Sequence, residues 1–172
     1  AVRGLDMLKD LGMSEHIGIS YGNVVYVSDI CGMYSQLDII KPLPFSKEEK
    51  ENIAGIKRIL EYGEIDKNIL FEYGLYLSLV AGSILGVDKE YITGLESELK
   101  IKRNKDIKIT SKEICDLLSV SPSKVIKEVY LTLRNLILDG ELENDNTEIR
   151  NYIYFHRGDW LNEWGDKEVL FS

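Results

Sequence analysis

The stretch from Ile109 to Leu142 constrains the fold most strongly, because its pattern predicts two helices separated by a tight turn. Thr110 or Ser111 can cap the first helix, since a side-chain oxygen satisfies a free amide of the first turn. A proline follows Ser121 at the first position of the second helix, where its missing N–H costs no hydrogen bond. Gly140 can then end that helix in the left-handed conformation. We therefore predict a helix-turn-helix pair.

The second predicted helix has an apolar arc and a polar arc when its residues are placed about 100° apart. The apolar arc comprises Val125, Ile126, Val129, Tyr130, Leu133, Leu136 and Ile137. Two leucines, Leu131 and Leu138, fall instead on the polar side. Leucines on a polar face require an apolar partner, which would be the N-terminal part of this chain, a second copy or another protein. We predict that these two leucines form a protein interface.

This helix pair resembles the winged helix-turn-helix superfamily over residues 100–156. The resemblance implies that the second helix enters the major groove of DNA and that a β-hairpin wing follows it. Ile107 to Ile109 would supply the short strand before the pair. Asn144 to Asn146 is a turn candidate, and the run RNYIYFH from Arg150 to His156 has the aromatic and β-branched residues typical of a strand.

Basic side chains concentrate around the predicted pair, although the whole chain has a net charge of −8. Residues 97–136 carry nine basic and five acidic side chains. A local basic face can bind phosphates even on an acidic protein. The predicted nucleic-acid-binding residues are Lys102, Arg103, Lys105, Lys108, Lys112, Ser121, Ser123, Lys124 and Lys127.

Three features of the same region oppose DNA binding, and the first is the presence of Leu131 and Leu138 on the polar side of the second helix. The predicted wing is acidic, with Glu141, Glu143, Asp145 and Glu148, and would be repelled by phosphates. No arginine stands at the start of the second helix, so bidentate contact with guanine is missing there. These features leave a second hypothesis open, in which the winged helix and the helical domain before it bind other proteins as part of a scaffold.

We predict a helical domain over residues 46–99. Ser46 and Glu49 have the spacing of a capping box, and the helix that they begin runs to about Tyr62. Asp66 can cap a second helix that extends to about residue 85 and is apolar almost all round. On length alone this helix could span a bilayer, but its tyrosines and glycines favour a buried central helix, and we expect no membrane partner.

The two ends of the chain predict smaller elements. Residues 1–45 suggest a small α/β element, with a helix over 1–13 and a β-hairpin formed by HIGIS (16–20) and NVVYVS (23–28). Residues 158–172 carry two tryptophans at helical spacing and predict a short C-terminal helix that docks on the core. The winged helix would occupy residues 100–157 between this helix and the helical domain.

Signals for catalysis are few. His16 and His156 lack neighbours at metal-ligand spacing, and Cys31 and Cys115 are far apart in sequence. No phosphate-binding loop, dinucleotide fingerprint or serine elbow is present. We therefore expect no catalytic residue, metal or cofactor. The absence of a targeting segment and the expectation of reduced thiols predict a cytoplasmic protein.

Together these patterns predict a mainly α-helical fold with a small β component: a helical N-terminal and central domain with a short β-hairpin, followed by a C-terminal winged helix. The first functional hypothesis is a non-enzymatic protein that binds duplex DNA in regulation, replication or segregation, as a homodimer or within a complex. The scaffold subunit is the second hypothesis. A fragment of an enzyme is the third.

Overall fold

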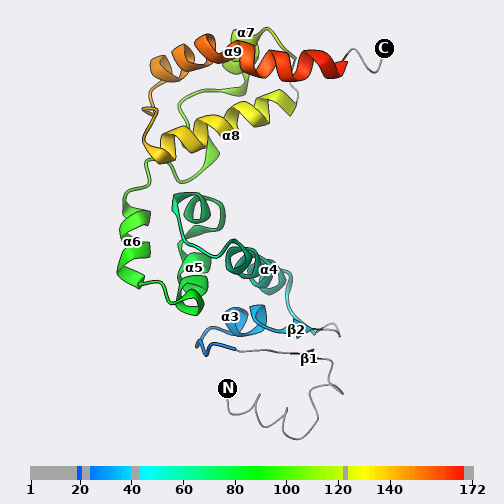
Figure 1. Ribbon diagram of the computed structural model, residues 1–172, viewed down its shortest axis with the longest axis vertical. Helices are drawn as coiled ribbons and strands as arrows, with labels where there is room; N and C mark the ends of the chain where they lie inside the picture. The colour runs from blue at the N-terminus through cyan, green and yellow to red at the C-terminus, as the bar shows by residue number, and fades with distance from the viewer. Residues whose placement is uncertain (1–18, 21–23, 40–42, 122–123, 169–172) are drawn as a thin grey trace, which may run out of the picture. The chain divides into compact units, whose positions relative to one another are not determined.

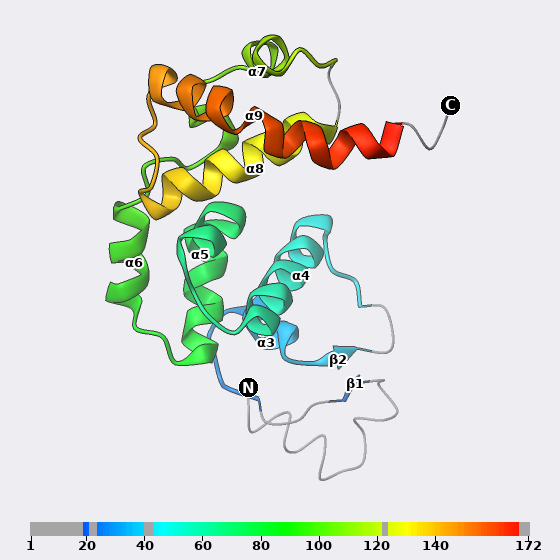
Figure 2. The same ribbon diagram turned by 45° about the horizontal axis from the view of Figure 1, so that its top comes forward.

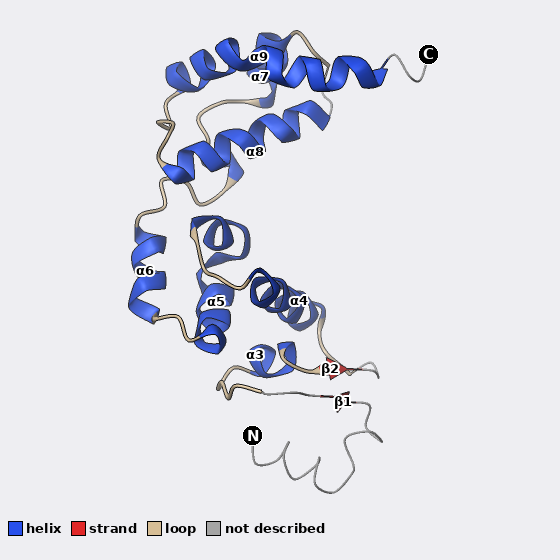
Figure 3. Cartoon of the chain, in the orientation of Figure 1, coloured by secondary structure: helices blue, strands red, loops and turns tan. Residues whose placement is uncertain are grey.

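The structure is a computed structural model, and it divides the chain into two compact units, Ala1–Glu98 and Leu99–Ser172. Helices make up nearly all of the regular structure in the described part (Figures 1 and 3). The residues described are 19–20, 24–39, 43–121 and 124–168, with side chains for 24–38, 43–121 and 124–161.

The first unit contains β1 (Ile19–Ser20), α3 (Ile30–Ser35), β2 (Asp38–Ile39), α4 (Lys47–Tyr62), α5 (Lys67–Leu85) and α6 (Lys89–Ser97). The second unit contains the 3-10 helix η1 (Asn104–Asp106), α7 (Ser111–Leu118), α8 (Lys124–Asp139) and α9 (Asn146–Glu168).

The prediction of a winged fold is wrong, because the strand expected over Arg150 to His156 lies inside helix α9, which spans Asn146–Glu168. The carboxylate of Asp145 accepts hydrogen bonds from two backbone N–H groups of the first turn, at 2.9 and 3.3 Å, and so caps the helix. Ile149 and Ile153 lie four residues apart and are both 0% exposed. The cap and the helical spacing of these isoleucines override the β-propensity of their aromatic neighbours. Residues 158–168 of the predicted tail helix continue α9, and residues 169–172 lie outside the described residues.

The predicted β-hairpin between residues 16–20 and 23–28 is also wrong where the structure describes it. Ile19 pairs with Ile39 in an antiparallel arrangement, and residues 24–28 form no strand. Each strand is two residues long, so the small sheet contributes little to the core (Figure 3). The helix predicted over residues 1–13 lies outside the described residues.

Helix α4 begins and ends as predicted. The Ser46 hydroxyl accepts a hydrogen bond from the Glu49 N–H (3.1 Å), and the Glu49 carboxylate accepts one from the Ser46 N–H (2.7 Å). These two bonds lower the pKa of Glu49. Gly63 ends the helix in the left-handed region with φ 86°. The capping box therefore fixes where the first long helix starts.

Helix α5 is apolar, but Gly74 breaks it. The Asp66 carboxylate caps its start by accepting a hydrogen bond from the Ile69 N–H (2.7 Å). Gly74 has φ 76° and ψ 171°, a conformation that is essentially restricted to glycine. By length and composition α5 could cross a membrane, yet it packs against both α4 and α6 in the first unit. It is thus the central helix of this unit, and Figures 1 and 2 show α4 beside it.

Small residues allow close packing around α5. A Cβ atom added at Gly82 would collide with the side chain of Ile92 on α6, which is 1% exposed. A Cβ atom added at Gly55 on α4 would lie 2.8 Å from the Leu77 side chain. Ser78 is completely buried, and its hydroxyl donates to a backbone carbonyl of the same helix.

The core of the second unit lies among α7, α8 and α9 (Figure 2). Its fully buried side chains are Ile114, Val129, Leu133, Ile137, Ile149 and Ile153. Thr110 caps α7 with Glu113 in a second capping box, and Gly140 follows α8 with φ 81°. The helix pair predicted from the sequence is therefore present, but α9 replaces the wing.

The contact of α5 with α6 gives a stability prediction. Gly82→Ala should lower the free energy of unfolding by up to about 2 kcal/mol, because overpacking costs about 1–3 kcal/mol and the helix propensity gained over glycine offsets about 1 kcal/mol of it. Gly94→Ala is the matched control on α6, since a Cβ atom there meets nothing within 4 Å. That variant should be equally or more stable. Urea unfolding followed by circular dichroism measures both, and a destabilised Gly94→Ala would contradict this account.

Candidate functional site

Two asparagines hold the chain before α7 against the start of α9. Asn144 Nδ2 donates to the carbonyl of Asp106 (2.8 Å), and Asn144 Oδ1 accepts from the N–H of Lys108 (2.9 Å). Asn146 Nδ2 donates to the carbonyl of Lys108 (2.8 Å). Side-chain amides thus satisfy backbone groups of a stretch that belongs to no strand. Sequence reasoning assigned Asn144 and Asn146 only to a turn.

The same stretch is anchored on its other side by burial. Ile107 and Ile109 are 3% and 6% exposed. The hydroxyl of Tyr130 on α8 donates to the carbonyl of Ile109 at 3.0 Å. The lysine between the two isoleucines is exposed. Alternation of buried and exposed residues therefore directs a basic side chain to solvent from a fixed backbone.

We call the bonds from Asn144 and Asn146 to the backbone of residues 106–108 the asparagine framework. Glu113 connects this framework to α7. One oxygen of its carboxylate accepts hydrogen bonds from the N–H and hydroxyl of Thr110, at 2.9 and 2.8 Å. The other accepts from Asn146 Nδ2 (3.3 Å) and Arg150 Nη1 (3.2 Å). The bonds from Thr110, then that from Asn146, lower the pKa of Glu113. A carboxylate at the centre of four donors thus ties α7 to α9.

The basic segment, defined here as residues 100–127, carries eight basic and three acidic side chains. Lys100 Nζ forms an ion pair with Glu143 Oε1 at 3.0 Å, and Arg103 Nε forms a longer one with Asp106 Oδ1 at 3.8 Å. Lys102 is also exposed. The other five basic residues are exposed, and no ion pair joins them to an acidic side chain that the structure describes: Lys105, Lys108, Lys112, Lys124 and Lys127.

The remaining predicted site residues have different surroundings. Ser121 is exposed in the turn after α7, and Ser123 lies outside the described residues. Leu131 is 42% exposed, whereas Leu138 is 3% exposed and belongs to the core of the second unit. The structure therefore does not bring the two leucines to one open surface.

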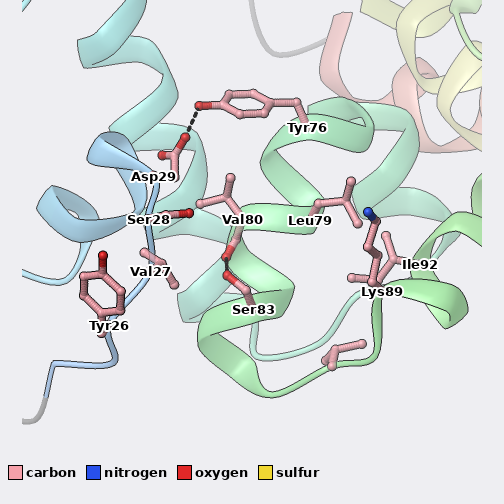
Figure 4. A pocket seen from close by; sticks show the side chains of 11 residues that line it. Tyr26, Val27, Ser28, Asp29, Tyr76, Leu79, Val80, Ser83, Lys89 and Ile92 are labelled. Atoms are coloured by element: carbon pink, nitrogen blue, oxygen red, sulfur yellow. Dashed lines mark hydrogen bonds between the residues drawn. The ribbon is translucent and has the colours of Figure 1, made fainter.

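A cleft of about 390 Å³ lies in the first unit, where α5, α6 and the residues before α3 meet (Figure 4). Its lining residues are Tyr26, Val27, Ser28, Asp29, Tyr76, Leu79, Val80, Ser83, Val87, Lys89 and Ile92. The Tyr76 hydroxyl donates to the Asp29 carboxylate at 2.6 Å, and the other Asp29 oxygen caps α3 by accepting from the Gly32 N–H (2.8 Å). Both Asp29 oxygens are therefore engaged.

The hydrogen bond to Asp29, followed by burial, raises the pKa of Tyr76 to about 12. Its partner stands 47 residues away in sequence, so no local pattern could have identified the pair. The short O–H···O contact joins α5 to the N-terminus of α3. We interpret this hydrogen bond as a structural contact at the rim of the cleft that stabilises the packing of α5 against the start of α3.

Other groups with reactive chemistry are scattered. Cys31 is buried, and burial raises the pKa of its thiol, while Cys115 is partly exposed. His156 is exposed on α9, and His16 lies outside the described residues. Within the described residues no group of three or more His, Cys, Asp or Glu side chains could hold a metal ion.

The asparagine framework predicts a stability effect. Asn144→Ala should lower the free energy of unfolding by about 1–3 kcal/mol, because it leaves a backbone donor and a backbone acceptor without their partner. Asn151→Ala is the control, since Asn151 is exposed on α9. It should change stability little or raise it slightly through helix propensity. Equal losses in urea unfolding of the two variants would argue against the framework.

The Tyr76 hydrogen bond predicts a dependence on alkaline pH. Its raised pKa means that the bond contributes stability in full below pH 10 and loses it as the pH rises from 10 towards 12. The stability difference between the wild type and Tyr76→Phe should therefore be constant up to about pH 10 and shrink above it. Urea midpoints measured from pH 8 to 11.5 test this, with Tyr26→Phe as a control from the same cleft. A difference that is independent of pH would contradict the raised pKa.

Comparison with known proteins identifies the family. A family model described as "tRNA nucleotidyltransferase domain 2 putative" matches residues 31–153. Searches of curated proteins and of solved structures found no match. The family match overturns the assignment to the winged helix-turn-helix superfamily and the hypothesis of a non-enzymatic DNA-binding protein. Because the match covers more than half of the sequence, the chain belongs to the tRNA nucleotidyltransferase domain 2 family.

Proposed function

We propose that this chain is a helical, RNA-holding part of a tRNA nucleotidyltransferase, with the basic segment contacting tRNA phosphates. Nucleotidyl transfer itself would take place on another part of the enzyme. The third sequence hypothesis, a fragment of an enzyme, is the one that agrees with the family. A cytoplasmic location, where tRNA is processed, is part of this proposal.

The observation that carries the proposal is that three of the five exposed lysines, Lys105, Lys108 and Lys112, stand on or beside backbone that side chains and a helix hold in place. Lys105 and Lys108 flank the backbone that Asn144 holds, and Lys112 follows in the first turn of α7. Lysines on an ordered frame contact phosphates without the entropic cost of ordering a loop. This distinguishes the basic segment from a solvated charged linker.

Charge distribution supports the same surface. Residues 1–98 carry nine basic and sixteen acidic side chains, so the first unit repels a polyanion. Residues 99–172 carry twelve basic and thirteen acidic side chains, and eight of the basic ones lie in the basic segment. Phosphate contacts are therefore proposed for this segment and not for the rest of the chain.

The salt dependence of tRNA binding tests the proposal. The slope of log affinity against log salt should fall by about 1 for each of Lys105→Ala, Lys108→Ala and Lys112→Ala, because each removes one phosphate contact. The triple variant should bind weakly at every salt concentration. Filter binding or fluorescence anisotropy with a transcribed tRNA gives the measurement.

The matched control removes the same charge elsewhere. Lys47, Lys50 and Arg58 are exposed on α4, and their triple alanine variant should keep the wild-type slope. If both triple variants weaken binding equally, the basic segment has no special role. Equal affinity of the wild type for tRNA and for duplex DNA would also contradict a function in tRNA binding.

A further inference from the structure

A second, smaller cleft lies beside α9 in the second unit. We call it the α8–α9 cleft, and its volume is about 270 Å³. The lining residues are Thr132, Tyr152, His156, Asp159 and Trp160. Its size falls below the range of about 300–1,000 Å³ that is usual for drug-sized ligands, so it suits a single ring system. Three of its five residues follow residue 153, where the family match ends.

The wall of this cleft is aromatic and held in place. Tyr152, His156 and Trp160 are spaced four residues apart and so share one face of α9. The Tyr152 and His156 rings are stacked, with centroids 4.1 Å apart and planes 19° apart. His156 Nδ1 lies 2.9 Å from the Tyr152 carbonyl, and this contact together with the stacking holds the imidazole beside the Tyr152 ring.

Such a wall suits a planar base. Tyr152 covers one face of the imidazole, and Trp160, 7% exposed, supports Tyr152 edge-on at 6.2 Å. His156 itself remains exposed, which leaves its ring accessible to a further planar group. Stacking on aromatic side chains is the usual way in which proteins bind unpaired bases of RNA.

The polar group of the cleft selects for N–H donors. Asp159 is exposed, and no hydrogen bond or ion pair engages its carboxylate among the side chains that the structure describes. Burial, and then the charges of Asp159 and Glu141, raise the pKa of Tyr152. This local negative field disfavours a phosphate and favours the donor edge of a base. Guanine alone among the four RNA bases presents two adjacent N–H donors, which match the two oxygens of a carboxylate.

We propose that the α8–α9 cleft binds one unpaired guanine of RNA, stacked on His156 and hydrogen-bonded through its Watson–Crick edge to Asp159. The inference rests on the proposed function, because RNA supplies the base. It goes further by assigning a base-specific contact to a region beyond the family match. The basic segment would then supply affinity, and the cleft would supply selectivity.

Titration with mononucleotides tests the cleft without tRNA. Guanosine 5′-monophosphate should shift the NMR signals of the His156 ring, identified by their loss in His156→Asn. Inosine 5′-monophosphate, which lacks the 2-amino group, should bind about tenfold more weakly, the effect of one hydrogen bond to a charged group. Uridine 5′-monophosphate should not bind measurably.

Variants on α9 separate the cleft from a general aromatic surface. Asp159→Asn should abolish the preference for guanosine over inosine monophosphate. Phe155→Ser removes a ring that is 78% exposed and does not line the cleft, so it should leave the titration unchanged. An equal response to guanosine and uridine monophosphates would overturn the proposal, as would a preference that survives Asp159→Asn.

The two proposals can fail separately. Binding of guanosine monophosphate in the cleft, without tRNA binding by the basic segment, would contradict the proposed function and leave the cleft assignment standing. Salt-dependent tRNA binding, without any change in the NMR signals of the His156 ring on addition of guanosine monophosphate, would support the proposed function and overturn the cleft assignment. A loss of guanosine binding in Phe155→Ser would identify the exposed ring as the docking surface and would overturn the cleft proposal.

Discussion

The second unit depends on asparagine side chains that bond to the backbone where a sheet would otherwise supply partners. Asn144 and Asn146 provide the donors and the acceptor for residues 106–108, and Glu113 carries the connection into α7. Backbone groups near a core must find partners, and here side chains supply several of them, including the Tyr130 hydroxyl that donates to the Ile109 carbonyl. Two buried isoleucines can then sit in the core while the residues beside them stay in solvent. The position of the lysines follows from this arrangement.

The framework also explains how an acidic protein can present a usable basic surface. Electrostatic repulsion between the first unit and a polyanion is screened beyond about 8–10 Å in physiological salt. The local arrangement of charge therefore decides where a polyanion binds. Two basic residues of the segment already have acidic partners, Lys100 with Glu143 and Arg103 with Asp106. Lys105, Lys108, Lys112, Lys124 and Lys127 form no ion pair with an acidic side chain that the structure describes, so they are open to an external ligand. The proposed division between a basic segment and a base-reading cleft separates affinity from selectivity.

The sequence allowed accurate prediction where the signal was local. Ser46, Asp66 and Thr110 cap the helices that they were expected to cap, because a cap needs only the next three residues. Residues 150–156 were misassigned to a strand because aromatic β-propensity was weighed above the cap at Asp145 and the helical spacing of Ile149 and Ile153. The Tyr76–Asp29 bond and the bonds from Asn144 to the backbone of 106–108 span 36 to 47 residues, so they depend on tertiary packing that a single sequence does not reveal.

The break at Gly74 has a dynamic consequence for α5. Extending a helix is favourable because each added residue forms one backbone hydrogen bond to the preceding turn. Gly74, with φ 76° and ψ 171°, interrupts this series of helical residues. The two parts of α5 can therefore open independently, and amide hydrogen exchange would divide this one helix into two cooperative segments. The Ser78 hydroxyl donates to the Gly74 carbonyl at 2.8 Å and so gives one backbone group at the break a hydrogen-bond partner.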